Sequence, residues 1–184
     1  MTATSTSGIA LLRGINVGRA KRIAMADLRS LFEELGFTDV RTVLNSGNVV
    51  FGGAPGKPNA AAAAIEQALV RRLGVASRVT VLGAEELALV VGGNPLVDLS
   101  SDHARLVAFI LQGDAQCKLL APLAAQDWAP GALAIGDRAA YVWCPTGVLD
   151  SAAAAAVGKL LGDATTSRNW NTLTKLHAMC TPPA

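Results

Sequence analysis

The residue types best suited to chemistry gather first in a polar stretch that follows the apolar run 9–12. Four cations fall within ten residues there, with no acid among them: Arg13, Arg19, Lys21 and Arg22. Guanidinium and ammonium groups, together with backbone N–H groups at glycines, donate hydrogen bonds to anions. The carboxamide of Asn16 adds a neutral donor and acceptor. The pattern indicates an anion-binding loop, and the alternative is a solvated basic loop before a helix.

A second polar group lies about thirty residues downstream. It consists of Asn45, Ser46 and Asn48, between the β-branched runs 40–44 and 49–51. A short loop with Ser-Gly between such runs predicts a hairpin. In a split βαβ unit, the end of the first strand and the hairpin after the second lie at one edge of the sheet. We therefore expect these side chains to lie beside the basic stretch and to form one rim with it.

A third polar stretch precedes the last predicted helix. Its candidate ligand-binding residues are Arg168, Asn169, Trp170, Asn171 and Lys175. Helix N-termini attract anions, and a tryptophan ring provides a flat face for stacking. In the structural alternative, Asn169 caps the helix while Trp170, Leu173 and His177 face the core.

Other chemistry has less support. The glycine spacing in residues 14–21 matches neither a P-loop nor G-x-G-x-x-G. His103 and His177 have no sequence-visible link to Ser46 or Cys117 that would indicate nucleophilic catalysis. The three cysteines are widely separated and form no CxxC, which argues against a disulfide framework and a zinc site. We therefore predict neither a metal nor a cofactor.

Composition sets the broad class. The 184 residues are 51% hydrophobic and 16% charged, which is typical of a globular protein. The net charge of +2 is too small to predict nucleic-acid or membrane binding by itself. No apolar run approaches the ~20 residues of a membrane-spanning helix, and the polar segment 1–7 lacks the features of a signal peptide. We expect a soluble, cytoplasmic protein with no membrane partner, and the sequence does not define its oligomeric state.

Apolar periodicity and turn residues define the expected elements. Strands are predicted at 9–12, 40–44, 49–51, 79–82, 106–111, 132–135, 139–143 and 164–166. Helices are predicted at 25–35, 60–73, 85–91, 115–125, 152–161 and 170–180, with Asn59, Asp150 or Ser151, and Asn169 as N-caps. This order predicts an α+β fold of two ferredoxin-like β-α-β-β-α-β halves, residues 1–93 and 94–184, with antiparallel or mixed sheets and a C-terminal helix.

Five motifs in the sequence resemble one family. They are Ala-Leu-Leu-Arg-Gly-Ile-Asn-Val-Gly at 10–18, Met-Ala-Asp-Leu-Arg at 25–29, and the stretches 35–40, 45–51 and 168–172. Together they resemble DUF 1697, an uncharacterised bacterial family with a domain of unknown function, over nearly the whole chain. Members usually have glycine or lysine where this chain has Arg19 and Ala20, a departure that leaves the loop basic. The resemblance implies a cytoplasmic α+β protein and supplies no reaction, substrate or cofactor.

The leading functional prediction is binding of an anionic small molecule, a nucleotide or another phosphorylated metabolite, at the basic, Asn-rich rim. Single-stranded nucleic-acid binding is an alternative, although aromatic residues make up only 4% of the chain. A second alternative is an enzyme whose Arg/Asn cluster stabilises a developing oxyanion. A purely structural role for the same residues is also open.

Overall fold

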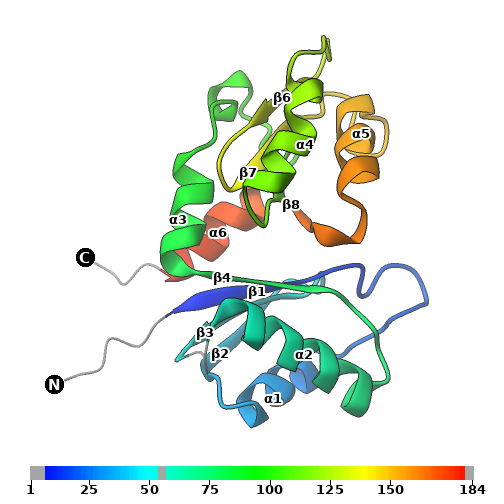
Figure 1. Cartoon of the computed structure of the whole chain (residues 1–184). Coiled ribbons are helices and arrows are strands. Elements are labelled where there is room, and N and C mark those ends of the chain that lie inside the picture. The colour runs from blue at the N-terminus through cyan, green and yellow to red at the C-terminus, as the bar shows by residue number, and fades with distance from the viewer. Residues whose placement is uncertain (1–6, 54–56, 181–184) are drawn as a thin grey trace, which may run out of the picture. The chain divides into compact units, whose positions relative to one another are not determined.

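The computed structural model describes residues 7–53 and 57–180. Residues 1–6 of the segment tested for a signal peptide, and residues 54–56 of the loop predicted before the second helix, lie outside the described residues. The chain forms two compact units (Figure 1). The first consists of Met1–Leu87 and Leu176–Ala184, and the second consists of Ala88–Lys175.

The first unit is built on a four-stranded antiparallel sheet with the strand order β2-β3-β1-β4. Its elements are β1 (Gly8–Leu12), α1 (Met25–Glu34), β2 (Thr38–Val43), β3 (Asn48–Gly52), α2 (Pro58–Leu73) and β4 (Val79–Gly83). β1 has the sequence Gly-Ile-Ala-Leu-Leu, and all five of its residues are buried. A strand that is apolar at every position is suited to the middle of a sheet. β1 accordingly pairs with β3 on one side and β4 on the other.

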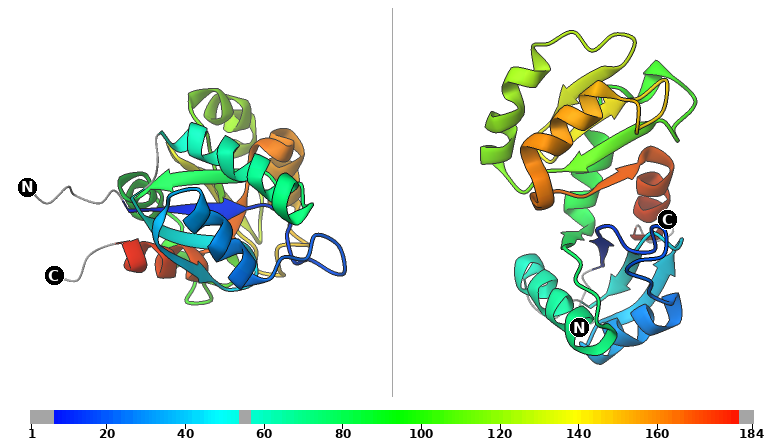
Figure 2. Two further views of the ribbon diagram at one scale, coloured as in Figure 1. Left: turned by 90° about the horizontal axis from the view of Figure 1, so that it is seen from below. Right: turned by 90° about the vertical axis from the view of Figure 1, so that its right-hand side faces the viewer.

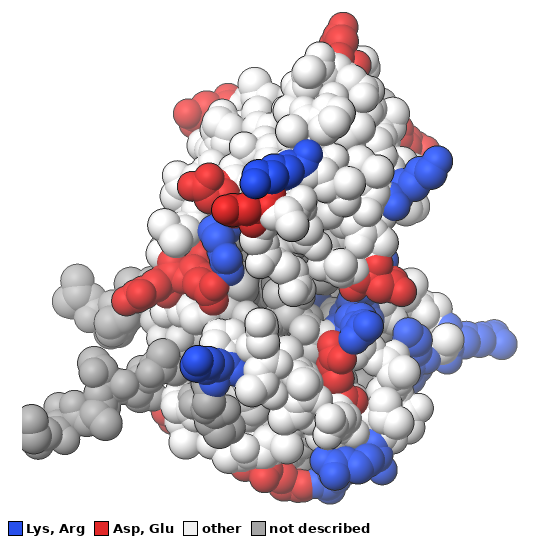
Figure 3. Space-filling model, viewed as in Figure 1, with Lys and Arg blue, Asp and Glu red and all other residues white. Residues whose placement is uncertain are grey.

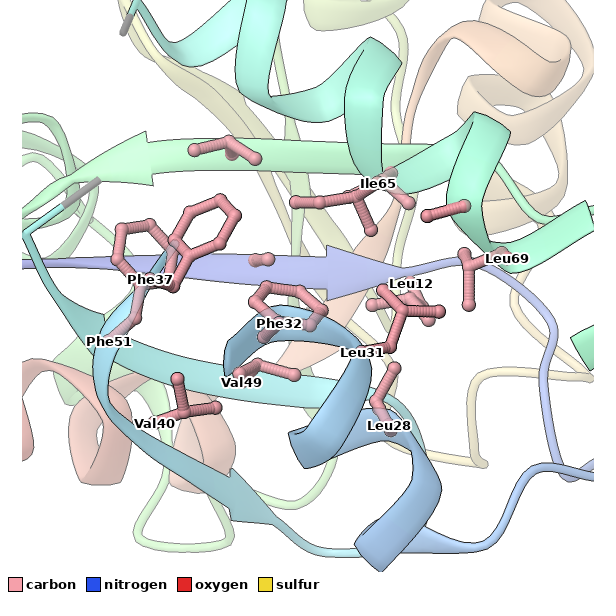
Figure 4. Close-up of a cluster of buried hydrophobic side chains, with 14 of the residues drawn as sticks. Leu12, Leu28, Leu31, Phe32, Phe37, Val40, Val49, Phe51, Ile65 and Leu69 are labelled. Atoms are coloured by element: carbon pink, nitrogen blue, oxygen red, sulfur yellow. The ribbon is translucent and has the colours of Figure 1, made fainter. Parts of the chain in front are cut away.

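The helices α1 and α2 cover one face of this sheet, and a hydrophobic core lies between them and the strands (Figure 4). α1 contributes Leu28, Leu31 and Phe32, which recur at helical spacing. The ring of Phe37 lies 5.0 Å from that of Phe32 and 4.7 Å from that of Phe51, measured between centroids. Each such pair adds about 0.5–1.5 kcal/mol beyond its buried area. The loop that leaves β1 and the turn that precedes β3 are therefore attached to a well-packed core.

The second unit has an antiparallel sheet with the equivalent order β6-β7-β5-β8. Its elements are β5 (Leu106–Ile110), α4 (Asp114–Ala124), β6 (Ala132–Ile135), β7 (Ala139–Trp143), α5 (Ala152–Leu161) and β8 (Ser167–Asn169). α4 and α5 cover one face, with a core between them and the sheet (Figure 2). On the other face the Tyr141 hydroxyl donates to the Val90 carbonyl oxygen at 2.7 Å. Burial, reinforced by the charge of Asp137, raises the pKa of Tyr141 to about 12.

Two further helices each follow the last strand of a sheet. α3 (Ala84–Gly92) follows β4, and α6 (Trp170–Cys180) follows β8. Each of these helices has residues in both units. Two short 3-10 turns, Val97–Leu99 and Gly162–Ala164, lie in the connections.

The two antiparallel sheets and their helices confirm an α+β protein. The predicted element order, β-α-β-β-α-β, occurs in each unit. β6, β7 and α6 have the bounds predicted from the sequence. Local periodicity and turn residues were sufficient for these elements because each has clear stop signals at its ends.

The strand predicted at 164–166 is wrong. Gly162–Ala164 is a 3-10 turn, and β8 begins at Ser167. Thr165 and Thr166 are β-branched, which favours a strand locally. The position at which β8 begins is set instead by its pairing with β5. Ser167 lies opposite Phe109, while the Thr165 hydroxyl donates to the Ile110 carbonyl oxygen at 2.7 Å.

The predicted helix caps are confirmed at two positions and wrong at a third. Ser151 Oγ accepts a hydrogen bond from the Ala154 N–H at 3.2 Å, and Asn169 Oδ1 accepts one from the Thr172 N–H at 2.9 Å. α2 begins at Pro58 with Lys57 as its N-cap, so Asn59 lies inside the first turn. Proline suits this first position because its missing N–H would have no partner within the helix.

Ser151→Ala is expected to lower the free energy of unfolding by about 1 kcal/mol, because the Ala154 N–H loses its partner. Chemical denaturation followed by circular dichroism measures the loss. The matched control is Asn59→Ala, for which we expect a change below about 0.5 kcal/mol. Equal losses in the two variants would contradict the assignment of the caps.

Candidate functional site

The connection between β1 and α1, residues 13–24, is the candidate site, and we refer to it as the basic loop. It extends beyond the end of β1 in two views of the ribbon (Figures 1 and 2). Its backbone turns repeatedly, with positive φ angles at Gly14 (65°), Asn16 (55°), Gly18 (62°) and Lys21 (51°). Asparagine is one of the residues other than glycine that adopts this conformation most readily. The residue type at position 16 therefore suits the local backbone.

The side chain of Asn16 closes the basic loop on itself. Its Oδ1 accepts from the Ile23 N–H at 2.8 Å, and its Nδ2 donates to the Ile23 carbonyl oxygen at 3.0 Å. The Asn16 N–H also donates to the Lys21 carbonyl oxygen at 3.0 Å. Ile15 and Ile23 are buried in the core of the first unit. Residues 17–22 thus form a tip whose base is fixed by hydrogen bonds and by two buried side chains.

The basic loop and the β2–β3 hairpin turn lie side by side, as sheet topology predicted. Asn16 Nδ2 donates a hydrogen bond to the Asn45 carbonyl oxygen at 2.8 Å. The Leu12 N–H donates to the Gly47 carbonyl oxygen at 2.8 Å. The side chains of Asn45 and Ser46 are exposed on this turn. The first two predicted stretches therefore form one rim of the first unit.

The buried side chain of Asn48 stabilises the hairpin turn through hydrogen bonds. Its side chain is 0% exposed, and its Nδ2 donates to the Val43 carbonyl oxygen and to Ser46 Oγ, both at 2.9 Å. Leu44 and Gly47 have positive φ angles of 59° and 82°, so the backbone of this turn is tightly constrained. The amide nitrogen of Asn48 is used by the turn itself, and its observed role is structural.

Arg13, the first residue of the basic loop, is held by the segment that leads into β4. Its N–H donates to the Arg78 carbonyl oxygen at 2.9 Å, and its carbonyl oxygen accepts from Ser77 Oγ at 2.9 Å. Glu66 supports the same segment: its Oε1 accepts from the Val79 N–H at 2.8 Å, and its Oε2 lies 3.2 Å from Arg78 Nη1. The position of Arg13 is therefore well defined. Sequence reasoning missed Ser77, because a single serine before a strand carries no distinctive signal.

Three cations occupy the tip of the basic loop. The side chains of Arg19, Lys21 and Arg22 are exposed, and they form no ion pair or hydrogen bond with any other described residue. Basic side chains gather on the surface where this loop extends (Figure 3). Like charges at close range repel one another, so a bound anion would relieve this repulsion. All three belong to the run of cations identified from the sequence in this stretch.

The third predicted stretch follows the structural alternative at two of its residues. The Trp170 ring is 3% exposed and packs edge-on against Tyr141, with a centroid separation of 6.1 Å and an interplanar angle of 77°. No face of this ring is open for a ligand to stack on. Asn169 caps α6 through its Oδ1, so this side chain also serves the fold.

The charged residues of the third stretch belong to the second unit, whereas the basic loop belongs to the first. Arg168 Nη1 donates to Thr166 Oγ1 at 2.9 Å and to the Ser167 carbonyl oxygen at 2.8 Å. Burial lowers the pKa of the Arg168 guanidinium to about 10, so the group is positively charged at neutral pH. Asn171 and Lys175 are exposed on α6.

The thiols of Cys144 and Cys180 and the ring of His103 show no sign of a reactive site. Burial raises the pKa of the Cys144 and Cys180 thiols, so both stay protonated at neutral pH. His103 Nε2 lies 3.3 Å from the Val97 carbonyl oxygen. Within residues 7–53 and 57–180, no group of three His, Cys, Asp or Glu side chains could hold a metal ion. Among the helices in the same ranges, none combines the length and the apolar composition of a membrane span.

Fold and site together define a class of protein with two α+β units, each built on a four-stranded antiparallel sheet, and an anchored basic loop on the first. The chain belongs to the family described as protein of unknown function (DUF1697), whose family model matches residues 6–141. No match was found among curated proteins.

A solved structure of similar fold is that of the conserved bacterial protein SP0830 from Streptococcus pneumoniae. The similarity covers 96% of this chain and 98% of that chain, with a TM-score of 0.76 and 23% sequence identity. At this level of identity the likeness concerns the fold alone.

Proposed function

We propose that the protein binds a phosphate-bearing anion at the basic loop. The observation that carries this proposal is a difference in length between equivalent connections. β1 and α1 are joined by twelve residues (13–24), whereas β5 and α4 are joined by three (111–113), although β1 and β5 occupy the same position in their sheets. Topology therefore does not require the additional length. A connection of about this length without secondary structure of its own is uncommon in a compact domain, and it is usually either functional or a linker. The side-chain hydrogen bonds between Asn16 and Ile23 give this connection an ordered base, which argues against a linker.

The chemistry of the basic loop fits this ligand. Arg19, Lys21 and Arg22 present donors that form charge-assisted hydrogen bonds with phosphate oxygens, and Arg13 adds a fourth positive charge at the start of the loop. The contacts of Asn16 hold the base of the tip before a ligand arrives. Groups that are already ordered lose less conformational entropy on binding.

Thermal shift measurements on the full chain test the proposal. The panel contains inorganic phosphate, nucleotides, phosphorylated metabolites, carboxylates and short oligonucleotides. A ligand at about a hundred times its dissociation constant stabilises the folded state by roughly 2.7 kcal/mol, which is readily detected. We expect at least one phosphate-bearing compound to raise the melting temperature. A panel without any such shift would contradict the proposal.

The triple variant Arg19→Ala/Lys21→Ala/Arg22→Ala is expected to bind the stabilising compound at least roughly 30-fold more weakly, which corresponds to about 2 kcal/mol. Titration calorimetry measures the change. A matched control variant removes three exposed cations from other elements: Arg71, Lys118 and Lys159. It has the same net charge as the loop variant, so equal losses in both would show non-specific attraction and contradict the site.

A further inference from the structure

We infer that the ligand of the basic loop is the phosphodiester backbone of a nucleic acid, which the loop contacts from outside. This inference rests on the proposed function and names its ligand class. The contact is made by the tip, residues 17–22, and does not depend on the base sequence.

The exposure of the tip favours an extended ligand over a small molecule. Every residue from 17 to 22 is exposed, and Val17 retains 71% of its accessible surface. A small-molecule site buries about 70–90% of its ligand within concave walls. The basic loop extends past the end of its strand (Figure 2), and basic side chains gather on the surface there (Figure 3). Such a surface suits a ligand that brings several phosphates to it at once.

The charges of the tip are available to such a ligand. Elsewhere in the first unit, arginines pair with acids, as in Arg29 with Glu33 and Arg78 with Glu66. The basic loop contains no acidic residue, and its tip cations have no ion pair among the described residues. Cations that approach a nucleic acid release its condensed counterions, and this gain does not require an enclosed site.

The aromatic side chains explain why base recognition is not expected. The four phenylalanines, Tyr141 and Trp170 are buried, and Trp128 and Trp143 are half-buried. Binding of single strands through stacked bases needs exposed rings. The contact therefore depends on phosphates alone, and duplexes and single strands of any sequence are expected to bind. With three cations involved, affinity is expected in the range of non-specific binding, about 10⁻⁴–10⁻⁶ M.

Fluorescence anisotropy with short labelled DNA tests this inference on the full chain. Three phosphate contacts predict that log K falls with log salt with a slope of about −2.1 for a single strand and about −2.7 for a duplex. Affinity is then expected to fall roughly 20- to 40-fold between about 50 and 200 mM salt. Permuting the DNA sequence is expected to leave the affinity unchanged. The Arg19→Ala/Lys21→Ala/Arg22→Ala variant is expected to lose this salt dependence, and the charge-matched control is expected to keep it.

Compact phosphate ligands, ATP and inorganic tripolyphosphate, are tested as competitors of the DNA and in direct titration. If either binds as tightly as the DNA, the inference is overturned while the proposed anion site stands. DNA binding that is unchanged in the loop variant, or that varies with base sequence, also overturns the inference. If neither DNA nor any phosphate compound binds, the inference and the proposed function both fail.

Discussion

Gly47→Ala is expected to lower the free energy of unfolding by about 3 kcal/mol, through strain in the turn and a clash in the core. Gly47 has a φ of 82°, a conformation that disfavours a side chain. A Cβ at this position would lie 2.8 Å from Leu12 Cβ and 2.9 Å from Ile15 Cδ1. Both neighbours are buried in the core, so neither can move without disturbing the packing around it.

Far-UV circular dichroism during chemical denaturation is the appropriate measurement. The tryptophans all lie in the second unit, so their fluorescence does not report directly on the turn. Gly74→Ala is the control, because Gly74 has a φ of 65° after α2 and a Cβ there would have no described atom within 4 Å. We expect it to cost about 1 kcal/mol from backbone strain alone. Equal losses would show that packing of the turn against β1 contributes nothing.

Asn48→Asp is expected to lower the free energy of unfolding by about 3–5 kcal/mol at neutral pH, at least as much as Gly47→Ala. The substitution replaces a buried N–H donor with an oxygen that would face two acceptors, the Val43 carbonyl oxygen and Ser46 Oγ. It also buries a negative charge at a side chain that is 0% exposed. Asn45→Asp is the matched control in the same turn, because the Asn45 side chain is exposed. We expect a change below about 0.5 kcal/mol there.

The loss in Asn48→Asp is expected to depend on pH. Burial raises the folded-state pKa of the new carboxyl above its unfolded value of about 3.9, because the charged form is disfavoured. The neutral form is compatible with burial and can donate to one of the two acceptors. Stability is therefore highest below the unfolded pKa and is lost as the pH rises through the folded pKa. A deficit that is the same at pH 4 and pH 7 would contradict this account.

These stability predictions bear on the interpretation of the Asn-rich rim. Asn16 and Asn48 were predicted to bind a ligand, yet the carboxamide of each forms hydrogen bonds with the backbone of the rim. A destabilisation of more than about 2 kcal/mol on their replacement would identify them as structural. The anion-binding proposal therefore depends on the charged side chains of Arg19, Lys21 and Arg22. Among the described residues, these three side chains form no hydrogen bond or ion pair.

Sequence alone determined those features of this protein that depend on neighbours along the chain. Apolar spacing defined α1 and α6, turn residues defined the β6–β7 hairpin, and Asn169 was predicted as a helix cap. The adjacency of the basic loop and the β2–β3 turn was also predictable, since it follows from the order of strands in a split βαβ unit. Each of these depends on local propensity or on a general rule of topology.

Only the tertiary structure decided which polar side chains serve the fold and which are open to a ligand. The partners of Asn16 lie seven and twenty-nine residues away, and the residues that pair with β5 begin at Ser167 rather than at the β-branched residues before it. Burial of Trp170 against Tyr141 likewise depends on packing between distant segments. Residue type and spacing specify what a side chain can donate or accept, but strand register and core packing specify which partner it meets.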